Sequence, residues 1–142
     1  MNTRKQVEHP VTEEITGIDL VEEQIRIAAV NPLRYCQSEV KLDGHAIEVR
    51  IYAEDSNTFF PSPGTIKKLV IPNGEGIRHE LAVTEQSVVT PYYDPMIAKL
   101  IVKEKDRQST IELLLLALEH YQIEGIKTNL PMLQRAAKSS SF

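Results

Sequence analysis

The chain has 142 residues, with 16 basic and 20 acidic side chains and a formal net charge of −4. This length suffices for one domain whose core needs no disulfide or metal, and a content of 42% apolar and 25% charged residues excludes general disorder and collagen-like repeats. The longest apolar run, residues 113–118, is too short to span a membrane, and the mild acidity argues against a nucleic-acid scaffold.

The first 43 residues are predicted to form an extended segment followed by helices. Asp19 and Glu22 have the spacing of a capping box, with aspartate in the capping position, and apolar residues recur behind them at helical spacing. Gly17 is expected to end a short preceding helix, and Asn31 and Pro32 to end the main one.

The middle of the chain is predicted to form strands. Residues 45–53 alternate in polarity, which places two sets of side chains on opposite faces: Ile47, Val49, Ile51 and Ala53 on one, and Glu48, Arg50 and Tyr52 on the other. Further strands are expected over residues 65–71, 77–83 and 96–102, with turns rich in proline and glycine between them.

The last part is predicted to be helical. Ser109 and Glu112 have capping-box spacing, although Asp106 competes as the cap. Gly125 is expected to end or follow this helix, and a final helix starts near Asn129. The apolar residues expected to form the buried stripe of the first helix are Ile111, Leu114, Leu115 and Leu118. The sequence therefore predicts an α+β fold, with a mostly antiparallel sheet and flanking helices.

Four polar residues near the start of the chain have strict two-residue spacing. In an extended segment the side chains of Asn2, Arg4, Gln6 and Glu8 point the same way. A neutral oxygen ligand, a cation, an amide and a carboxylate together suit a small oxyanion beside a metal ion. Fully extended, Arg4 and Glu8 would lie roughly 13 Å apart, so convergence on one small molecule requires a bend near Gln6 and Val7. The alternative is a solvated strand face with an Arg–Glu ion pair.

Arg50 is the second candidate site residue. It lies on the polar face of an otherwise apolar strand, between Glu48 and Tyr52. The alternative to a functional role is a salt bridge across this face, which would contribute little stability.

The same residues carry a resemblance to a known family. Five segments occur in one order along nearly the whole chain: MNTRKQVEHPVTE (residues 1–13), GHAIEVRIYAED (44–55), FPSPG (60–64), PYYDPMIAKL (91–100) and GIKTN (125–129). Their sequences and order resemble those of the biotin carboxylases, which are ATP-grasp enzymes. This resemblance implies a ligase that uses ATP and bicarbonate to carboxylate the ureido nitrogen of biotin through a carboxyphosphate intermediate.

The resemblance assigns roles to both candidate groups. Glu8 is expected to be the base that deprotonates bicarbonate, and Arg4 the cation that stabilises the resulting anion. Gln6 and the backbone of Val7 complete the bicarbonate site. Arg50 is expected to stabilise the negative charge that develops on the biotin oxygen, since a guanidinium offers both charge and directed donors.

Further roles follow from the same resemblance. Asn2 resembles a ligand of Mg²⁺ or Mn²⁺, and Asp94 is expected to line the biotin site. The alternative for Asp94 is an aspartate that braces a tight turn. His9 is expected to have a structural role. ATP and the metal ion are the expected cofactors, biotin is the carried substrate, and both the ATP and metal sites are incomplete in this sequence.

The resemblance also implies an organisation into two parts. Residues 1–43 are expected to be the tail of an ATP-grasp domain, and residues 44–142 the C-terminal domain of a biotin carboxylase. Met1 coincides with a position inside the first motif, so we expect a fragment that is inactive alone. The single Cys36 excludes an internal disulfide, and no leader is visible; we therefore expect a cytoplasmic protein.

The expected partners are a biotin carboxyl carrier, a carboxyltransferase and a second copy of the full-length protein, with neither nucleic acid nor membrane. Acetyl-CoA carboxylase, and hence fatty acid biosynthesis, is one setting among several carboxylases. Two other functions stay open: a non-catalytic dimerisation or interaction module, and an ATP-grasp ligase with a different acceptor. Arg50, within its long matching strand, argues against the latter.

Overall fold

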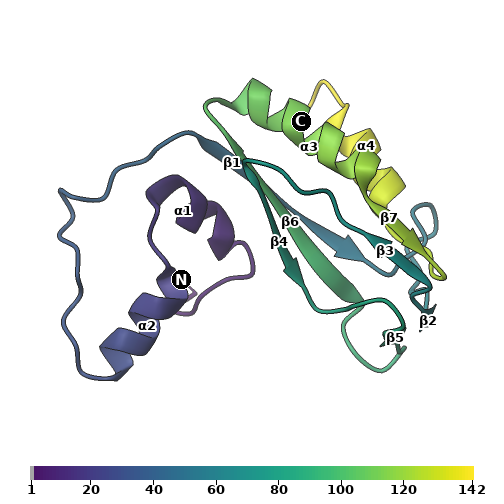
Figure 1. Cartoon of the computed structure of the whole chain (residues 1–142), viewed down its shortest axis with the longest axis horizontal. Helices are drawn as coiled ribbons and strands as arrows, with labels where there is room; N and C mark the ends of the chain where they lie inside the picture. The colour runs from purple at the N-terminus through teal and green to yellow at the C-terminus, as the bar shows by residue number, and fades with distance from the viewer. Residues whose placement is uncertain (1) are drawn as a thin grey trace.

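The computed structural model describes residues 2–142. A three-stranded antiparallel sheet, with the order β1-β6-β4, lies between helices on its two faces (Figure 1). The strands of this sheet are β1 (His45–Tyr52), β4 (Ile77–Leu81) and β6 (Met96–Glu104). α3 (Arg107–His120) and α4 (Leu130–Ala137) cover one face, and α1 (His9–Thr16) packs on the other. This confirms the expected mixed fold with an antiparallel sheet.

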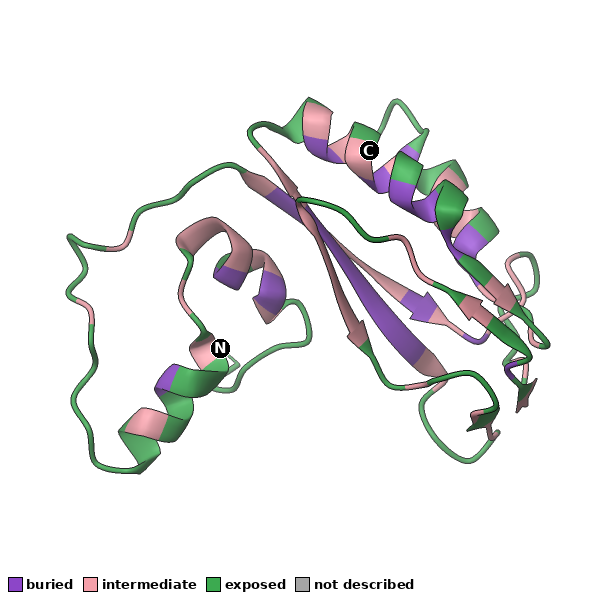
Figure 2. Ribbon diagram, viewed as in Figure 1, coloured by how far each residue is buried: buried purple, intermediate pink, exposed green. Residues whose placement is uncertain are grey.

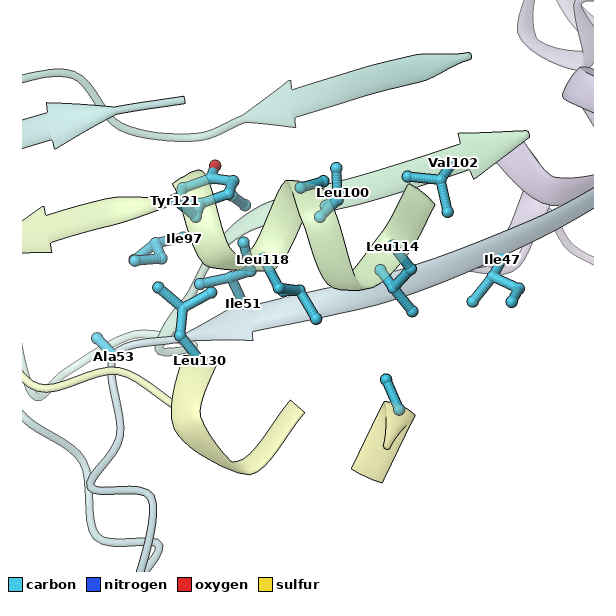
Figure 3. Close-up of a cluster of buried hydrophobic side chains, with 13 residues drawn as sticks. Ile47, Ile51, Ala53, Ile97, Leu100, Val102, Leu114, Leu118, Tyr121 and Leu130 are labelled. Atoms are coloured by element: carbon cyan, nitrogen blue, oxygen red, sulfur yellow. The ribbon is translucent and has the colours of Figure 1, made fainter. Parts of the chain in front are cut away.

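The apolar core lies between the sheet and α3. Ile51 and Leu100 project from the sheet toward Leu114 and Leu118 of α3, and all four side chains are almost fully buried (Figure 3). The central strand β6 is buried along most of its length (Figure 2). The alternation predicted for residues 45–53 is confirmed, because Ile47, Ile51 and Ala53 belong to this core.

The helix boundaries follow the capping signals. α2 (Leu20–Ala28) begins after Asp19, whose carboxylate accepts a hydrogen bond from the Glu22 N–H at 2.8 Å. α3 is capped in the same way by Asp106 and not by Ser109, because the Asp106 carboxylate accepts the Ser109 N–H at 2.9 Å. Gly17 ends α1 with a φ of 69°, a backbone conformation that glycine adopts without strain.

The strand predicted over residues 65–71 is wrong as a single element. The structure divides it into β2 (Gly64–Thr65), which pairs with β5 (Val88–Val89), and β3 (Lys68–Val70), which pairs with β7 (Gln122–Glu124). The two pieces turn toward partners that lie far apart in the sequence. β7, directly after α3, has three residues and left no periodicity to detect.

α2 lies away from the core. Its apolar residues Ile25 and Ile27 are 65% and 52% exposed, and in Figure 1 this helix lies at the far side of α1 from the sheet. A long connection without helix or strand then leads to β1. Within residues 2–142, no helix is long and apolar enough to cross a membrane.

Candidate functional site

The first polar residues of the chain form a bent segment. The backbone bends at Arg4 and turns at Val7 and Glu8 before α1 begins, and the His9 N–H donates to the Gln6 carbonyl at 3.2 Å. A second contact of 2.9 Å joins the His9 Nδ1 atom to the same carbonyl. His9 therefore stabilises the turn, as its expected structural role requires, and the turn lies close to the bend that convergence on one ligand demands.

Glu8 and Arg50 meet across 42 residues of sequence. The Arg50 guanidinium donates to the Glu8 carboxylate at 2.8 Å. The Arg50 and Glu8 side chains are 39% and 53% exposed, so a ligand has access to both groups. An exposed pair of this kind contributes little stability and is readily broken by a competing ligand.

This contact changes the partner expected for Glu8. The alternative interpretation of the segment pairs Glu8 with Arg4, but the structure pairs it with Arg50. Arg4 and Gln6 are exposed, and within residues 2–142 Arg4 forms no ion pair. The charge of Arg4 is thus available to an anion at the surface of this segment.

Lys99 of the central strand β6 contacts the same turn. Its ammonium group donates to the Val7 carbonyl at 3.1 Å and forms an ion pair with Glu80 on the neighbouring strand. In the sheet register, Arg50 of β1, Lys99 of β6 and Glu80 of β4 lie directly opposite one another. One row across the sheet therefore contacts both Val7 and Glu8.

The polar face of the sheet attaches to α1 by a network of charges. Arg78 of β4 pairs with Glu13 at 2.9 Å and Glu14 at 3.1 Å, both from α1, and with Glu80 at 2.6 Å. Burial disfavours the charge on Glu80, but Lys99 and Arg78 outweigh it and lower the pKa of the carboxyl. Burial likewise opposes the charge on Arg78, and its three carboxylate partners raise its pKa nonetheless.

The side chain of Glu48 lies on the same face of β1 as Arg50 and is shielded from solvent. Its side chain is 3% exposed, and neither carboxylate oxygen has a hydrogen-bond partner. The nearest cation contact runs from Oε1 to the Arg50 Nε at 3.9 Å. Burial raises the pKa of Glu48 to about 7, and Lys99 and Arg50 counteract this only in part. The alternating pattern placed Glu48 on the polar face, but gave no sign that its side chain would be shielded from solvent.

Asn129 fixes the backbone of the strand that carries Arg50. Its side-chain amide donates to the Arg50 carbonyl at 3.0 Å and accepts the Tyr52 N–H at 2.9 Å. β1 is an edge strand, and the buried Asn129 satisfies two groups of that edge.

The sequence interpretation missed the roles of Lys99 and Asn129. The available signal for Lys99 was a lysine within an otherwise apolar central strand. The available signal for Asn129 was its place in the GIKTN motif.

Within residues 2–142, no hydrogen bond or ion pair joins Asp94 to Asn2. The Asp94 carboxylate accepts the Met96 N–H at 2.8 Å, which is the turn-bracing contact. Asn2 is exposed and supplies one neutral oxygen, fewer than the six ligands that Mg²⁺ takes. Within residues 2–142, the one cluster of three metal-capable side chains is His9, Glu13 and Glu80, whose two carboxylates are already paired with Arg78.

Comparison with known families separates the chain into two regions. Residues 48–142 match the family described as the biotin carboxylase C-terminal domain. The chain belongs to this family. Residues 1–36 match a different description, the ATP binding domain of the carbamoyl-phosphate synthase L chain. Glu8 therefore lies in the second match and Arg50 in the biotin carboxylase match.

Relatives match the chain over its whole length. Biotin carboxylase 2 of Bacillus subtilis is 62% identical over 142 residues, which are 100% of this chain and 32% of that protein. The 2-oxoglutarate carboxylase small subunit of Hydrogenobacter thermophilus is 50% identical, over 100% of this chain and 30% of that protein. The chain thus spans about a third of the length of these relatives.

A solved structure also matches nearly the whole chain. The biotin carboxylase domain dimer of the Hydrogenobacter thermophilus 2-oxoglutarate carboxylase, in complex with MgADP, ADP and bicarbonate, superposes with a TM-score of 0.97 at 49% identity. The match covers 99% of this chain and 31% of that one. The fold of the biotin carboxylase C-terminal domain is therefore present in this chain.

Proposed function

We propose that this chain supplies the bicarbonate- and biotin-binding residues of a longer biotin carboxylase, an ATP-dependent ligase. The observation that carries the proposal is the 2.8 Å contact between Glu8 and Arg50. The resemblance assigns one of these groups to bicarbonate and the other to biotin. Their contact would bring the two substrates to one place, as transfer of a carboxyl group between them requires.

The proposed chemistry assigns each group one task. Glu8 accepts the proton of bicarbonate, and the oxygen of the resulting anion attacks the γ-phosphate of ATP, which yields carboxyphosphate and ADP. Arg4 stabilises the developing charge, and Gln6 and the Val7 backbone hold the anion. Carboxyphosphate decomposes to carbon dioxide and phosphate; the released phosphate accepts the ureido proton of biotin, and the deprotonated nitrogen captures the carbon dioxide. Arg50 stabilises the negative charge that this deprotonation places on the biotin oxygen.

Two assignments rest on the resemblance with less structural support. Asp94 at the biotin site and Asn2 at a metal site remain proposals, and Asn2 needs ligands from outside this chain to hold Mg²⁺ or Mn²⁺. The division into residues 1–43 and 44–142 is also a proposal, supported by the change in family match between residues 36 and 48.

The proposed partners are those of a carboxylase: a biotin carboxyl carrier, a carboxyltransferase and a second copy of the full-length protein. The dimer named for the Hydrogenobacter structure supports the last of these. Relatives that include a 2-oxoglutarate carboxylase and a pyruvate carboxylase subunit leave acetyl-CoA as one acceptor among several. A cytoplasmic setting is proposed from the single Cys36.

The test compares this chain with an N-terminally extended full-length protein. Phosphate release from ATP is measured with and without bicarbonate and free biotin. We expect activity that depends on both in the full-length protein, and none in the 142-residue chain. A folded full-length protein with no such activity would contradict the proposal.

Variants then test the roles of the two charged groups. Arg4→Ala and Glu8→Ala in the full-length protein should each lower the turnover rate by about 10²–10³, the usual cost of removing stabilisation at a developing charge. Normal turnover in both variants would refute these roles while leaving the family assignment intact.

A further inference from the structure

Two cations on neighbouring strands contact two consecutive residues of the proposed bicarbonate segment. Arg50 and Lys99 are direct partners in the antiparallel pairing of β1 and β6. Arg50 contacts the Glu8 carboxylate at 2.8 Å, and Lys99 contacts the Val7 carbonyl at 3.1 Å. The sheet therefore holds this turn at both a side chain and a backbone atom.

Lys99 occupies an unusual position for a lysine. It is 8% exposed on the central strand, between Ala98 and Leu100, which point into the core. A buried ammonium group is costly unless hydrogen bonds and an opposite charge compensate it. Glu80 supplies the charge, and the Val7 carbonyl supplies a hydrogen-bond acceptor from 92 residues away.

The consequence of this contact is geometric. The peptide unit between Val7 and Glu8 is planar, so fixing the Val7 carbonyl also fixes the direction of the Glu8 N–H. Only the two dihedral angles of Val7 separate this plane from the Val7 N–H. The Lys99 bond thus restrains the backbone that the proposed function assigns to bicarbonate.

We propose that Lys99 is a positioning residue for bicarbonate: paired with Glu80, it holds the Val7–Glu8 peptide in its binding conformation. This inference rests on the proposed function. It assigns Lys99 no contact with substrate, and it predicts a selective effect on bicarbonate. A general loss of stability would instead affect every substrate alike.

The experiment compares three variants of the full-length protein, in which Lys99 is replaced by methionine or arginine and Lys103 by methionine. Lys103 is the matched control because it lies on the same strand and the same face, but pairs with Asp43 at 3.2 Å. We expect Lys99→Met to raise the KM for bicarbonate roughly tenfold or more, the factor typical for loss of a hydrogen bond to a charged group. The KM for ATP should stay within about twofold, whereas Lys99→Arg, which keeps charge and donors, should recover most of the bicarbonate affinity.

Hydrogen exchange gives a second readout that needs no activity. The backbone amides of Val7, Glu8, His9 and Val11 should exchange faster in Lys99→Met than in the unaltered protein or in Lys103→Met; Pro10 has no amide hydrogen. If Lys99→Met does not fold, Lys99→Gln, which keeps a polar side chain but loses the ammonium group, takes its place and should shift both readouts in the same direction.

The outcomes separate this inference from the proposed function. An unaltered protein without bicarbonate-dependent ATP cleavage overturns the proposed function, and the exchange of residues 7–11 then still decides whether Lys99 holds the turn. An active protein in which Lys99→Met matches Lys103→Met in both readouts overturns the inference alone. Equal losses for ATP and bicarbonate also overturn it.

Discussion

Replacing the buried Glu48 by methionine should stabilise the domain at neutral and alkaline pH. Methionine has a similar length and carries no charge, so it removes a carboxylate whose two oxygens lack hydrogen-bond partners. Removal of a buried charge that its neighbours compensate only in part is favourable when the replacement fills the same space. The gain should depend on pH, because the cost of Glu48 depends on its ionisation.

The magnitude follows from the difference in pKa between the folded and unfolded states. The pKa of Glu48 is about 7 when folded, against an ordinary value of 4.5. Between these values the folded state retains a proton that the unfolded state has released, so the unfolding free energy contributed by this group falls as pH rises. At about 1.4 kcal/mol for each tenfold change in proton affinity, the total is roughly 3 kcal/mol. The loss of stability caused by ionised Glu48 is small below pH 4.5 and complete above about pH 8.

Urea unfolding of this chain at a series of pH values measures the effect. The stability difference between Glu48→Met and the unaltered chain should grow by about 3 kcal/mol from pH 4.5 to pH 8, whatever constant offset the new side chain brings. Glu112→Gln, which removes an exposed carboxylate of α3, is the matched control. A difference that stays flat or shrinks over this range would refute the reasoning.

Three further changes test other parts of the structure. Arg50→Ala in the full-length protein should reduce biotin carboxylation more than biotin-independent ATP cleavage, with the exposed Arg135→Ala as control; equal losses in both assays would contradict its role at biotin. Leu114→Ala, at a fully buried position of α3, should cost about 2–5 kcal/mol in urea unfolding, against less than about 0.5 kcal/mol for the half-exposed Leu116→Ala. Asn129→Ala should lower the free energy of unfolding by about 1–3 kcal/mol for each of the two backbone groups of β1 that lose their hydrogen-bond partner. A change below 1 kcal/mol in the same assay would argue against this anchoring.

Local signals in the sequence predicted the regular elements well. Alternation over residues 45–53 identified β1, and Asp19 in a capping position located the start of α2; α3 is capped by Asp106, the competing candidate, and not by Ser109 of the predicted capping box. Both signals depend on neighbouring residues, which the sequence displays directly. The division of residues 65–71 between β2 and β3 depends on partners at residues 88–89 and 122–124. No local pattern carries that information.

The sequence nominated residues for the candidate site but did not predict the contacts between them. Spacing singled out Glu8 and Arg50 separately, and the resemblance gave each a role, yet neither implied that they touch. The same limit applies to Glu48, since a polar face looks solvated until its packing is known. Lys99 illustrates a usable rule: a charged residue within an apolar central strand must have a partner, although the sequence does not say which one.

The composition of the main apolar cluster bears on how the chain reaches its native state. Within the part of the chain that the structure describes, every member of that cluster lies at or beyond residue 47. Residues 45–142 can therefore collapse and form their sheet first. The N-terminal segment would then dock late, guided by long-range attraction between Arg78 and the glutamates of α1. Docking of this kind should slow as salt is added, whereas collapse of the sheet should not. The turn that bears Glu8 would thus be the last part of the proposed site to assemble.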